Sequence, residues 1–339
     1  MSGCRYTVNA VSGTRTSLAG RLARMGLADV PRAERTLAEL GVCDGPAPGG
    51  TTKDEGLLAA LATAADPDLA LASLARIAER DRAIIEQVRR DARFRDRLIA
   101  ALGASAALAD HLARHPGDRS VLSGASGGER PQPAAIRAEL LRAVGADPQA
   151  PRPRASTGLA SAASVLAAAY HRRLLHLAAR DLTGDSTVDE VAGELAGIAG
   201  AVLEAALAVA RAELPADIAV PPFAVIAMGK CGARELNYAS DVDVIFVVGD
   251  DTDAAGMKVA TQLATGMIGV CERFTPEGAI FPVDPNLRPE GRNGPLVRTL
   301  GSHLAYYDRW AKTWEFQALL KARPAAHRLD VLDEEPGRP

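Results

Sequence analysis

The sequence predicts an α+β protein in which a mainly helical region, residues 1–215, precedes a domain with a small mixed sheet, residues 216–324. Two observations predict this class. Through the first region, apolar residues recur at spacings of three and four, which is typical of amphipathic helices. From Pro221 onward, short apolar runs bounded by glycine and proline replace that pattern, which is typical of buried strands. Helices followed by a cluster of strands favour an α+β architecture.

The first region is expected to hold a series of helices joined by short breaks. Helical patterns are clearest over 84–102, 134–144, 159–182 and 188–213. Two segments rich in Gly, Ser, Pro and Arg, 117–133 and 147–158, are expected to be exposed loops. They flank the short helix of this series.

The second domain is expected to alternate strands and helices. We predict strands over 223–228, 242–248 and 279–283, and helices over 255–273 and 300–321. Trp310 and Trp314 lie four residues apart on the last helix, so we expect them to pack in the core. The final segment, 325–339, is polar and acidic, which predicts a disordered tail.

The bulk composition argues against several classes of protein. A net charge of −3 and an aromatic content of 4% argue against a nucleic-acid partner. The four cysteines are widely scattered, which favours free thiols in a reducing cytoplasm over disulfides or a zinc site. The N-terminus lacks a secretory signal and the apolar runs are short and interrupted. We therefore expect a cytoplasmic protein with no membrane partner.

The candidate catalytic residues are two aspartates that open the second strand. Asp241 and Asp243 project to one side, because strand side chains alternate between faces. Two carboxylates this close repel each other unless a cation lies between them, and hard oxygen ligands suit Mg²⁺. A two-metal site needs a third carboxylate, for which Asp284 at the end of the third strand is the best candidate. A similar pair, Asp251 and Asp253, is expected to be a solvated loop.

The phosphate-binding candidates lie around the same two strands. Gly229 follows the first strand, where a glycine lets backbone N–H groups approach a phosphate closely, and Lys230 could add a charged donor. Ser240, next to Asp241, belongs to the same candidate nucleotide site. Arg288 is a further candidate because guanidinium groups suit bidentate contact, as are Lys321 and Arg323 with less support. The alternatives are a surface lysine and structurally paired arginines.

Four stretches together resemble a known family. They are YHRRLLHLAARDLTG at 170–184, FAVIAMGKCGARELNYASDVDVIF at 223–246, PVDPNLRPEGRNGPLVR at 282–298 and YYDRWAKTWEFQALLKARP at 306–324. Their sequence and order resemble the glutamine synthetase adenylyltransferase and adenylyl-removing enzymes, with the strongest likeness over about 160–324. Ordered motifs of this length are far more specific than a single short pattern.

The resemblance implies a polymerase-β-like nucleotidyltransferase fold, with Asp241, Asp243 and Asp284 as metal ligands. It also implies action on a tyrosine of glutamine synthetase, where AMP is added from ATP or removed with phosphate to give ADP. The chain resembles the N-terminal, deadenylylating copy of the two catalytic domains in full-length members. Regulation of nitrogen assimilation, a response to glutamine and binding of the PII regulatory protein are further implications.

The tail after Pro324 does not resemble the continuation of the family, and no second catalytic domain is present, so we expect a truncated chain. Two other functions stay open at this point. The chain could be another polymerase-β-like transferase, acting on an antibiotic, a tRNA end or another protein. It could also be an inactive fragment that only binds glutamine synthetase or PII. The direction of the reaction is not fixed by the sequence.

Overall fold

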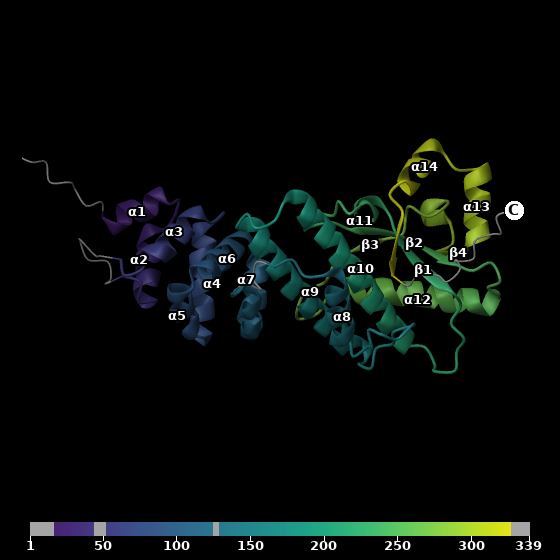
Figure 1. Ribbon diagram of the computed structural model, residues 1–339, viewed down its shortest axis with the longest axis horizontal. Helices are drawn as coiled ribbons and strands as arrows, with labels where there is room; N and C mark the ends of the chain where they lie inside the picture. Colours follow the sequence, from purple (N-terminus) through teal and green to yellow (C-terminus); the bar gives the residue numbers. More distant parts are fainter. Residues whose placement is uncertain (1–16, 44–51, 125–128, 327–339) are drawn as a thin grey trace, which may run out of the picture. The chain divides into compact units, whose positions relative to one another are not determined.

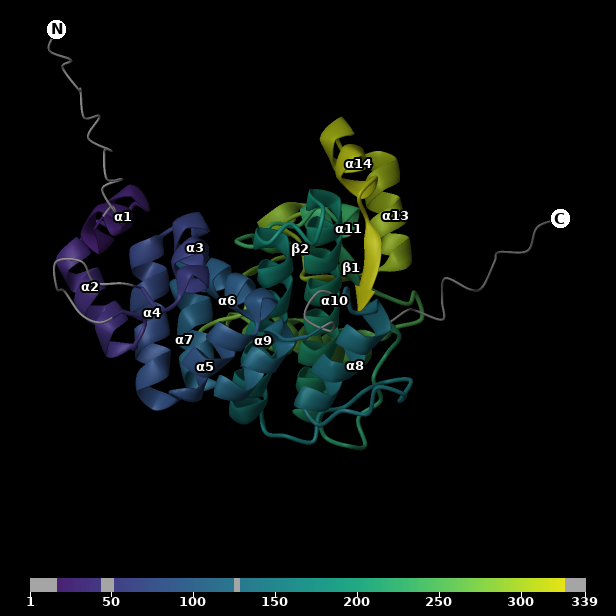
Figure 2. The same cartoon turned by 60° about the vertical axis from the view of Figure 1, so that its left-hand side comes forward.

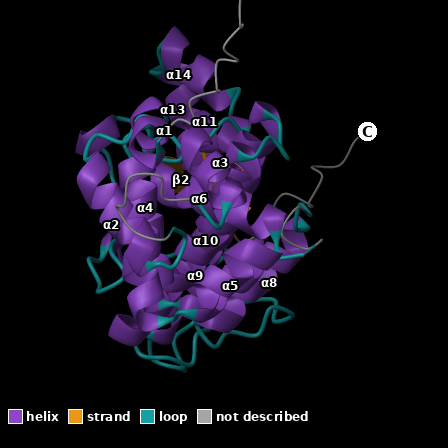
Figure 3. Ribbon diagram, turned by 90° about the vertical axis from the view of Figure 1, so that its left-hand side faces the viewer, coloured by secondary structure: helices purple, strands orange, loops and turns teal. Residues whose placement is uncertain are grey.

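A computed structural model describes residues 17–43, 52–124 and 129–326 of the chain. It divides the chain into two compact units, Met1–Gly117 and Asp118–Pro339. The α+β class is confirmed: helices dominate (Figure 3), and the strands form one small mixed sheet. The division falls well before residue 215, where the secondary structure changes, because three helices that precede the sheet in the chain belong to the sheet's compact unit.

The described residues of the first unit form helices joined by turns (Figure 1), and an isolated β-bridge pairs Cys43 with Thr52. Its helices are α1 Leu18–Arg24, α2 Val30–Glu39, α3 Glu55–Thr63, α4 Pro67–Arg80, α5 Ala83–Arg90, α6 Ala92–Ala104 and α7 Ala106–Arg114. Asp91 divides the helix expected over 84–102: its extended backbone ends α5, and its side chain accepts the Phe94 N–H to begin α6. Fully buried Leu74, Phe94 and Leu98 belong to the core of this unit.

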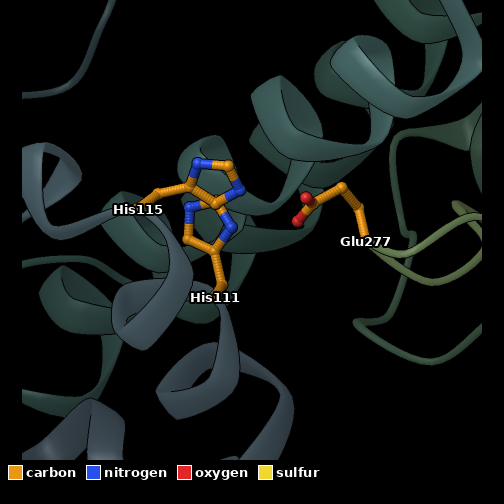
Figure 4. Close-up of side chains that lie close together, drawn as sticks. All are labelled: His111, His115 and Glu277. Atoms are coloured by element: carbon orange, nitrogen blue, oxygen red, sulfur yellow. The ribbon is translucent and has the colours of Figure 1, made fainter. Parts of the chain in front are cut away.

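Two histidine rings pack against each other at the end of α7. The ring centroids of His111 and His115 lie 4.8 Å apart, and the planes are tilted by 35° (Figure 4). His111 is completely buried. The tilted pair places one aromatic ring against the other on the buried face of this helix.

The second unit combines helices with the sheet. Its helices are α8 Pro133–Ala143, α9 Leu159–Leu182, α10 Val188–Ala212, α11 Gly229–Ala233, α12 Ala254–Glu272, α13 Leu300–Arg309 and α14 Thr313–Leu319, with 3₁₀ turns at Pro116–Leu122, which crosses the division between the units, and at Gly291–Asn293. The strands are β1 Phe223–Ala227, β2 Val242–Val248, β3 Val283–Asp284, β4 Val297–Thr299 and β5 Arg323–Ala326. The long helices α9 and α10 pack side by side, with α8 against both (Figure 2).

Strand β2 is the centre of the sheet. It pairs antiparallel with β1, in register from Phe223↔Val248 to Ala227↔Val244. It pairs parallel with both β3 and β4, and β5 adds an antiparallel strand on the far side of β1. Every other strand except β5 is therefore positioned directly by β2.

The two faces of β2 have different neighbours. Val242, Val244, Phe246 and Val248 join one apolar cluster with residues of α10 and α12. On the other face, Ile245 and Val247 contact a smaller cluster that includes residues of α13 and α14. In Figure 1, α12 lies below the sheet, and α13 and α14 lie above it. Because strand side chains alternate, Asp243 projects to this second face.

Helix α10 is the central helix of the second unit. Its length and hydropathy alone would allow it to cross a membrane, so the expectation that no apolar segment is long enough for this was wrong. The structure buries 89% of its most apolar window inside the protein. Its two buried glutamates are paired, Glu194 with Arg180 at 2.6 Å and Glu204 with Arg137 at 2.7 Å. Helix α10 is thus the core helix of this unit.

Several expected elements of the second unit differ from those observed. The strand expected over 279–283 shrinks to β3, Val283–Asp284, and strands β4 and β5 were not predicted. Residues Ala325 and Ala326, expected in a disordered tail, belong to β5. The rest of that tail, 327–339, lies outside the described residues. These strands are too short for a sequence pattern and exist because a neighbouring strand pairs with them.

The helix expected over 300–321 is divided into α13 and α14. Trp310 ends α13, and a capping arrangement between Lys312 and Glu315 begins α14. The Glu315 carboxylate also accepts a 2.9 Å hydrogen bond from the Tyr306 hydroxyl across the break. The expectation that Trp310 and Trp314 are core residues was wrong, because they are 74% and 53% exposed.

Removing the Glu194 carboxylate is expected to destabilise the second unit by about 3–5 kcal/mol, because the buried Arg180 charge would lose the carboxylate with which it pairs. Urea unfolding of Glu194→Leu measures this loss. The double variant Arg180→Met/Glu194→Leu removes both charges and should recover most of it. A double variant as unstable as the single one would show that charge pairing is not the cause.

Candidate active site

Three aspartates and one lysine share a space on the face of the sheet that bears Asp243. Asp243 and Asp284 are direct partners in the parallel register of β2 and β3, so their side chains lie on the same face. Asp241 lies two residues before Asp243 and projects to the same side. Burial raises the pKa of Asp243, repulsion by Asp241 and Asp284 raises it further, and the Lys230 ammonium opposes the rise. The structure therefore brings together four of the residues that the sequence singled out.

Gly229 joins this group through a close backbone contact. The Met228 N–H donates to the Asp243 carbonyl at 2.9 Å, which extends the ladder of β1 and β2 to the start of α11. Gly229 follows with a φ of +50°, a conformation that favours glycine. A Cβ atom there would lie 2.1 Å from Oδ2 of Asp243. Both the backbone and the neighbouring carboxylate thus require glycine at this turn.

The Asp284 carboxylate is held by the turn that follows it. Its Oδ1 accepts the Asn286 N–H at 2.7 Å, a turn-forming role that aspartate commonly has before proline. On the other side, the Val283 N–H donates to Glu272 of α12 at 3.1 Å, and the Val242 N–H donates to the Pro282 carbonyl at 2.9 Å. The very short strand β3 is thus fixed by side-chain and backbone contacts together.

Sequence reasoning missed the role of Glu272. Its contact joins the end of a helix to a strand 11 residues later, and no periodic pattern marks such a pair. Only the fold brings the carboxylate to the strand.

Arg288 lies beside Asp284, but its hydrogen bonds go to the loop that carries both residues. Its guanidinium donates to the carbonyl oxygens of Pro285 at 2.9 Å and Gly294 at 3.2 Å. Burial lowers its pKa and the Asp284 charge opposes that change. In this arrangement Arg288 closes the loop from Pro285 to Gly294 and so supports the position of Asp284.

The other candidates occupy different surroundings. Ser240 is half-buried, with its hydroxyl 3.4 Å from the Asp241 carboxylate. Lys230 is exposed, and within the described part of the chain its ammonium has no ion-pair partner. Lys321 forms an ion pair with Glu235 at 2.9 Å, and Arg323 donates to the carbonyls of α11. Of the basic candidates, Lys230 is therefore the one with an unshared charge near the aspartates.

Comparison with known proteins supports the resemblance seen in the sequence motifs. The profile of the family described as glutamate-ammonia ligase adenylyltransferase matches residues 95–335. The chain belongs to this family. A Streptomyces avermitilis relative is 47% identical over 339 residues, covering 95% of this chain and 31% of the relative. A Streptomyces coelicolor relative is 49% identical over 93% of this chain and 30% of the relative.

A third relative, from Cutibacterium acnes, is 40% identical over 80% of this chain and 28% of its own length. All three are named bifunctional glutamine synthetase adenylyltransferase/adenylyl-removing enzyme. This family member spans about three tenths of the length of these relatives. What they do as whole proteins is therefore a basis for a proposal about this chain.

Replacing Gly229 with alanine is expected to destabilise the second unit by at least about 2 kcal/mol, because the positive φ and the clash with Asp243 both oppose a Cβ atom. Thermal and urea unfolding measure the effect. Gly197→Ala in α10 is the matched control: its Cβ would meet nothing within 4 Å, so it should stabilise the helix by up to about 1 kcal/mol. Equal effects of the two substitutions would contradict the assigned contact.

Asp243→Asn is expected to raise the melting temperature at neutral pH in EDTA. The folded-state pKa of Asp243 is raised, so its stabilising contribution is present below the unfolded pKa of about 3.9 and is lost as pH rises through the folded pKa. The gain from asparagine should therefore shrink as the pH falls toward about 4. A gain that does not depend on pH would mean that the ionisation of Asp243 is not its source.

Proposed function

We propose that this chain carries a Mg²⁺-dependent nucleotidyltransferase site that removes AMP from a tyrosine of glutamine synthetase by phosphorolysis. The observation that carries the proposal is the convergence of Asp241, Asp243 and Asp284 with Lys230 at the Gly229 turn. Membership of the adenylyltransferase family and the names of its relatives support the substrate.

The donor set fits a divalent cation. All three candidate ligands are carboxylates, which suit the hard Mg²⁺ ion. Burial raises the pKa of Asp243, and repulsion by Asp241 and Asp284 raises it further. We assign Asp241, Asp243 and Asp284 as the residues that hold it. When bound, Mg²⁺ supplies charge neutralisation at the phosphoryl oxygens.

The remaining residues bind and orient the phosphate groups in this proposal. Lys230 provides an exposed ammonium next to the aspartates, and the Gly229 turn and Ser240 provide neutral donors. Arg288 acts mainly by holding the loop of Asp284. Inorganic phosphate attacks the phosphorus of the tyrosine–AMP ester, the phenolate leaves, and ADP is released. A phenol pKa of about 10 makes the phenolate a tolerable leaving group.

The partners named by this proposal are glutamine synthetase as protein substrate and phosphate and ADP as nucleotide-site ligands, with ATP as the AMP donor if the site adds AMP and releases pyrophosphate. The double name of the relatives, adenylyltransferase and adenylyl-removing enzyme, makes AMP addition the second candidate. Binding of the PII regulatory protein and a cytoplasmic location rest on the resemblance alone.

The test is ADP release from adenylylated glutamine synthetase in the presence of Mg²⁺ and phosphate. Asp241→Asn should lower the rate by about 100-fold or more, because it removes a group that holds charge-stabilising cations at the reacting phosphate. Asp251→Asn is the matched control, since that aspartate lies in an exposed turn after β2, and it should keep the original rate.

The outcomes separate the candidates. Phosphate-dependent ADP release that is lost only in Asp241→Asn supports phosphorolysis. Incorporation of AMP from ATP into unmodified glutamine synthetase, without ADP release, would favour AMP addition. Binding of glutamine synthetase without turnover in either direction, by a sample that melts cooperatively, would overturn the catalytic proposal.

A further inference from the structure

The second unit contains a cavity among α8, α10 and β5 whose lining does not include the three aspartates. Its volume is about 250 Å³, close to the lower end of the range for small-ligand sites. Four arginines line it, Arg130, Arg137, Arg234 and Arg323, together with two glutamates and three glycines of α10. We call this cavity the arginine groove.

The two glutamates of the groove are already neutralised. Glu204 accepts hydrogen bonds from both sides of the Arg137 guanidinium, at 2.7 and 2.5 Å. Glu194 accepts one from Arg180 at 2.6 Å and lies 3.7 Å from Arg130. The Glu194 and Glu204 carboxylates are therefore already paired and do not balance the charges of Arg234 and Arg323.

Among the described residues, no carboxylate forms an ion pair with Arg234 or Arg323. Within the part of the chain that the structure describes, the Arg234 side chain makes no hydrogen bond and no ion pair. Arg323 is half-buried and uses its donors on uncharged carbonyl oxygens, those of Gly232 at 3.2 Å and Cys231 at 3.0 Å. The groove thus carries two positive charges in excess, which favours an anionic occupant.

The floor of the groove is open because α10 presents glycines there. A Cβ added at Gly197 would meet nothing within 4 Å, and one at Gly193 would come no closer than 3.8 Å to Arg130. A ligand can therefore approach the helix backbone directly, as glycine permits at sites of close contact. The arginine groove is therefore accessible and is bordered by guanidinium groups.

We propose that the arginine groove binds a small anion that bears carboxylate or phosphate groups. The planar guanidinium fork matches both kinds of oxyanion, and the volume limits the occupant to a small metabolite or an inorganic ion. The site is separate from the aspartates, so its occupancy does not depend on the proposed phosphorolysis.

The groove is connected to the catalytic turn through α11. Arg323 holds the carbonyls of Cys231 and Gly232, and Arg234 ends this helix with a φ of +62°. The same short helix begins at Gly229, against the Asp243 carboxylate. An anion that recruits Arg234 and Arg323 therefore acts on a segment of five residues whose other end lies at the aspartates. Occupancy of the groove is expected to change the mobility of α11.

Calorimetric titration in EDTA tests binding, with succinate and inorganic phosphate as separate probes. We expect saturable binding of at least one probe, weakened about tenfold or more in Arg234→Gln through loss of a charged donor. Gly197→Leu should abolish binding because the leucine side chain fills the arginine groove. Gly197→Ala is its control, because a single methyl group leaves most of the groove open. Succinate binding alone would assign the groove to carboxylates, and phosphate binding alone to phosphates.

Hydrogen exchange of residues 228–236 provides the second readout. The bound probe should change exchange there in the original protein and in Gly197→Ala, and should have no effect in Gly197→Leu. Absence of saturable binding by both probes, or binding that Gly197→Leu leaves unchanged, would overturn the proposal. Because neither readout measures turnover, failure here would leave the proposed catalytic function intact, and failure of the ADP-release assay would leave the groove intact.

Discussion

The contact between the Asp243 carboxylate and Gly229 is the constraint on which the candidate site depends. Strand β2 carries the carboxylate, and the turn after β1 carries the glycine, so the antiparallel pairing of the two strands sets their separation. The turn has space only for a residue without a side chain. It thereby brings the backbone of the turn and the Lys230 side chain close to the three aspartate carboxylates. A site that binds phosphate and a cation needs this proximity.

The apolar interior explains how the second unit holds repelling carboxylates together. One face of β2 is covered by α10 and α12, and the packing of Val242 and Val244 there fixes the orientation of the aspartates that alternate with them. The stability of that core offsets the cost of placing acids side by side on the other face. Because side chains of β2 alternate between its two faces, the same strand buries Val242 and Val244 in the core and presents Asp243 at the site.

Two arginines of the second unit hold backbone segments that carry candidate site residues. Arg288 closes the loop of Asp284, and Arg323 joins β5 to α11 through carbonyl contacts. Each acts on a segment that carries a candidate site residue, without itself lying among the aspartates as a free charge. The connection through α11 also gives the arginine groove a physical path to the site, because α11 is short and packed tightly against Lys321 and Ala227.

The sequence by itself determined the α+β class, the common face of Asp241 and Asp243, and the glycine turn before them, because these follow from local periodicity and residue type. The family followed from the resemblance of four ordered motifs. The tertiary structure determined the features that depend on contacts between residues far apart in the chain. The register of β3 placed Asp284 beside Asp243, and strand pairing created β4 and β5. Packing grouped α8 to α10 with the sheet, and solvent exposure of Trp310 followed from a helix break. Such contacts leave no periodic signal, since each is set by the shape of the folded unit.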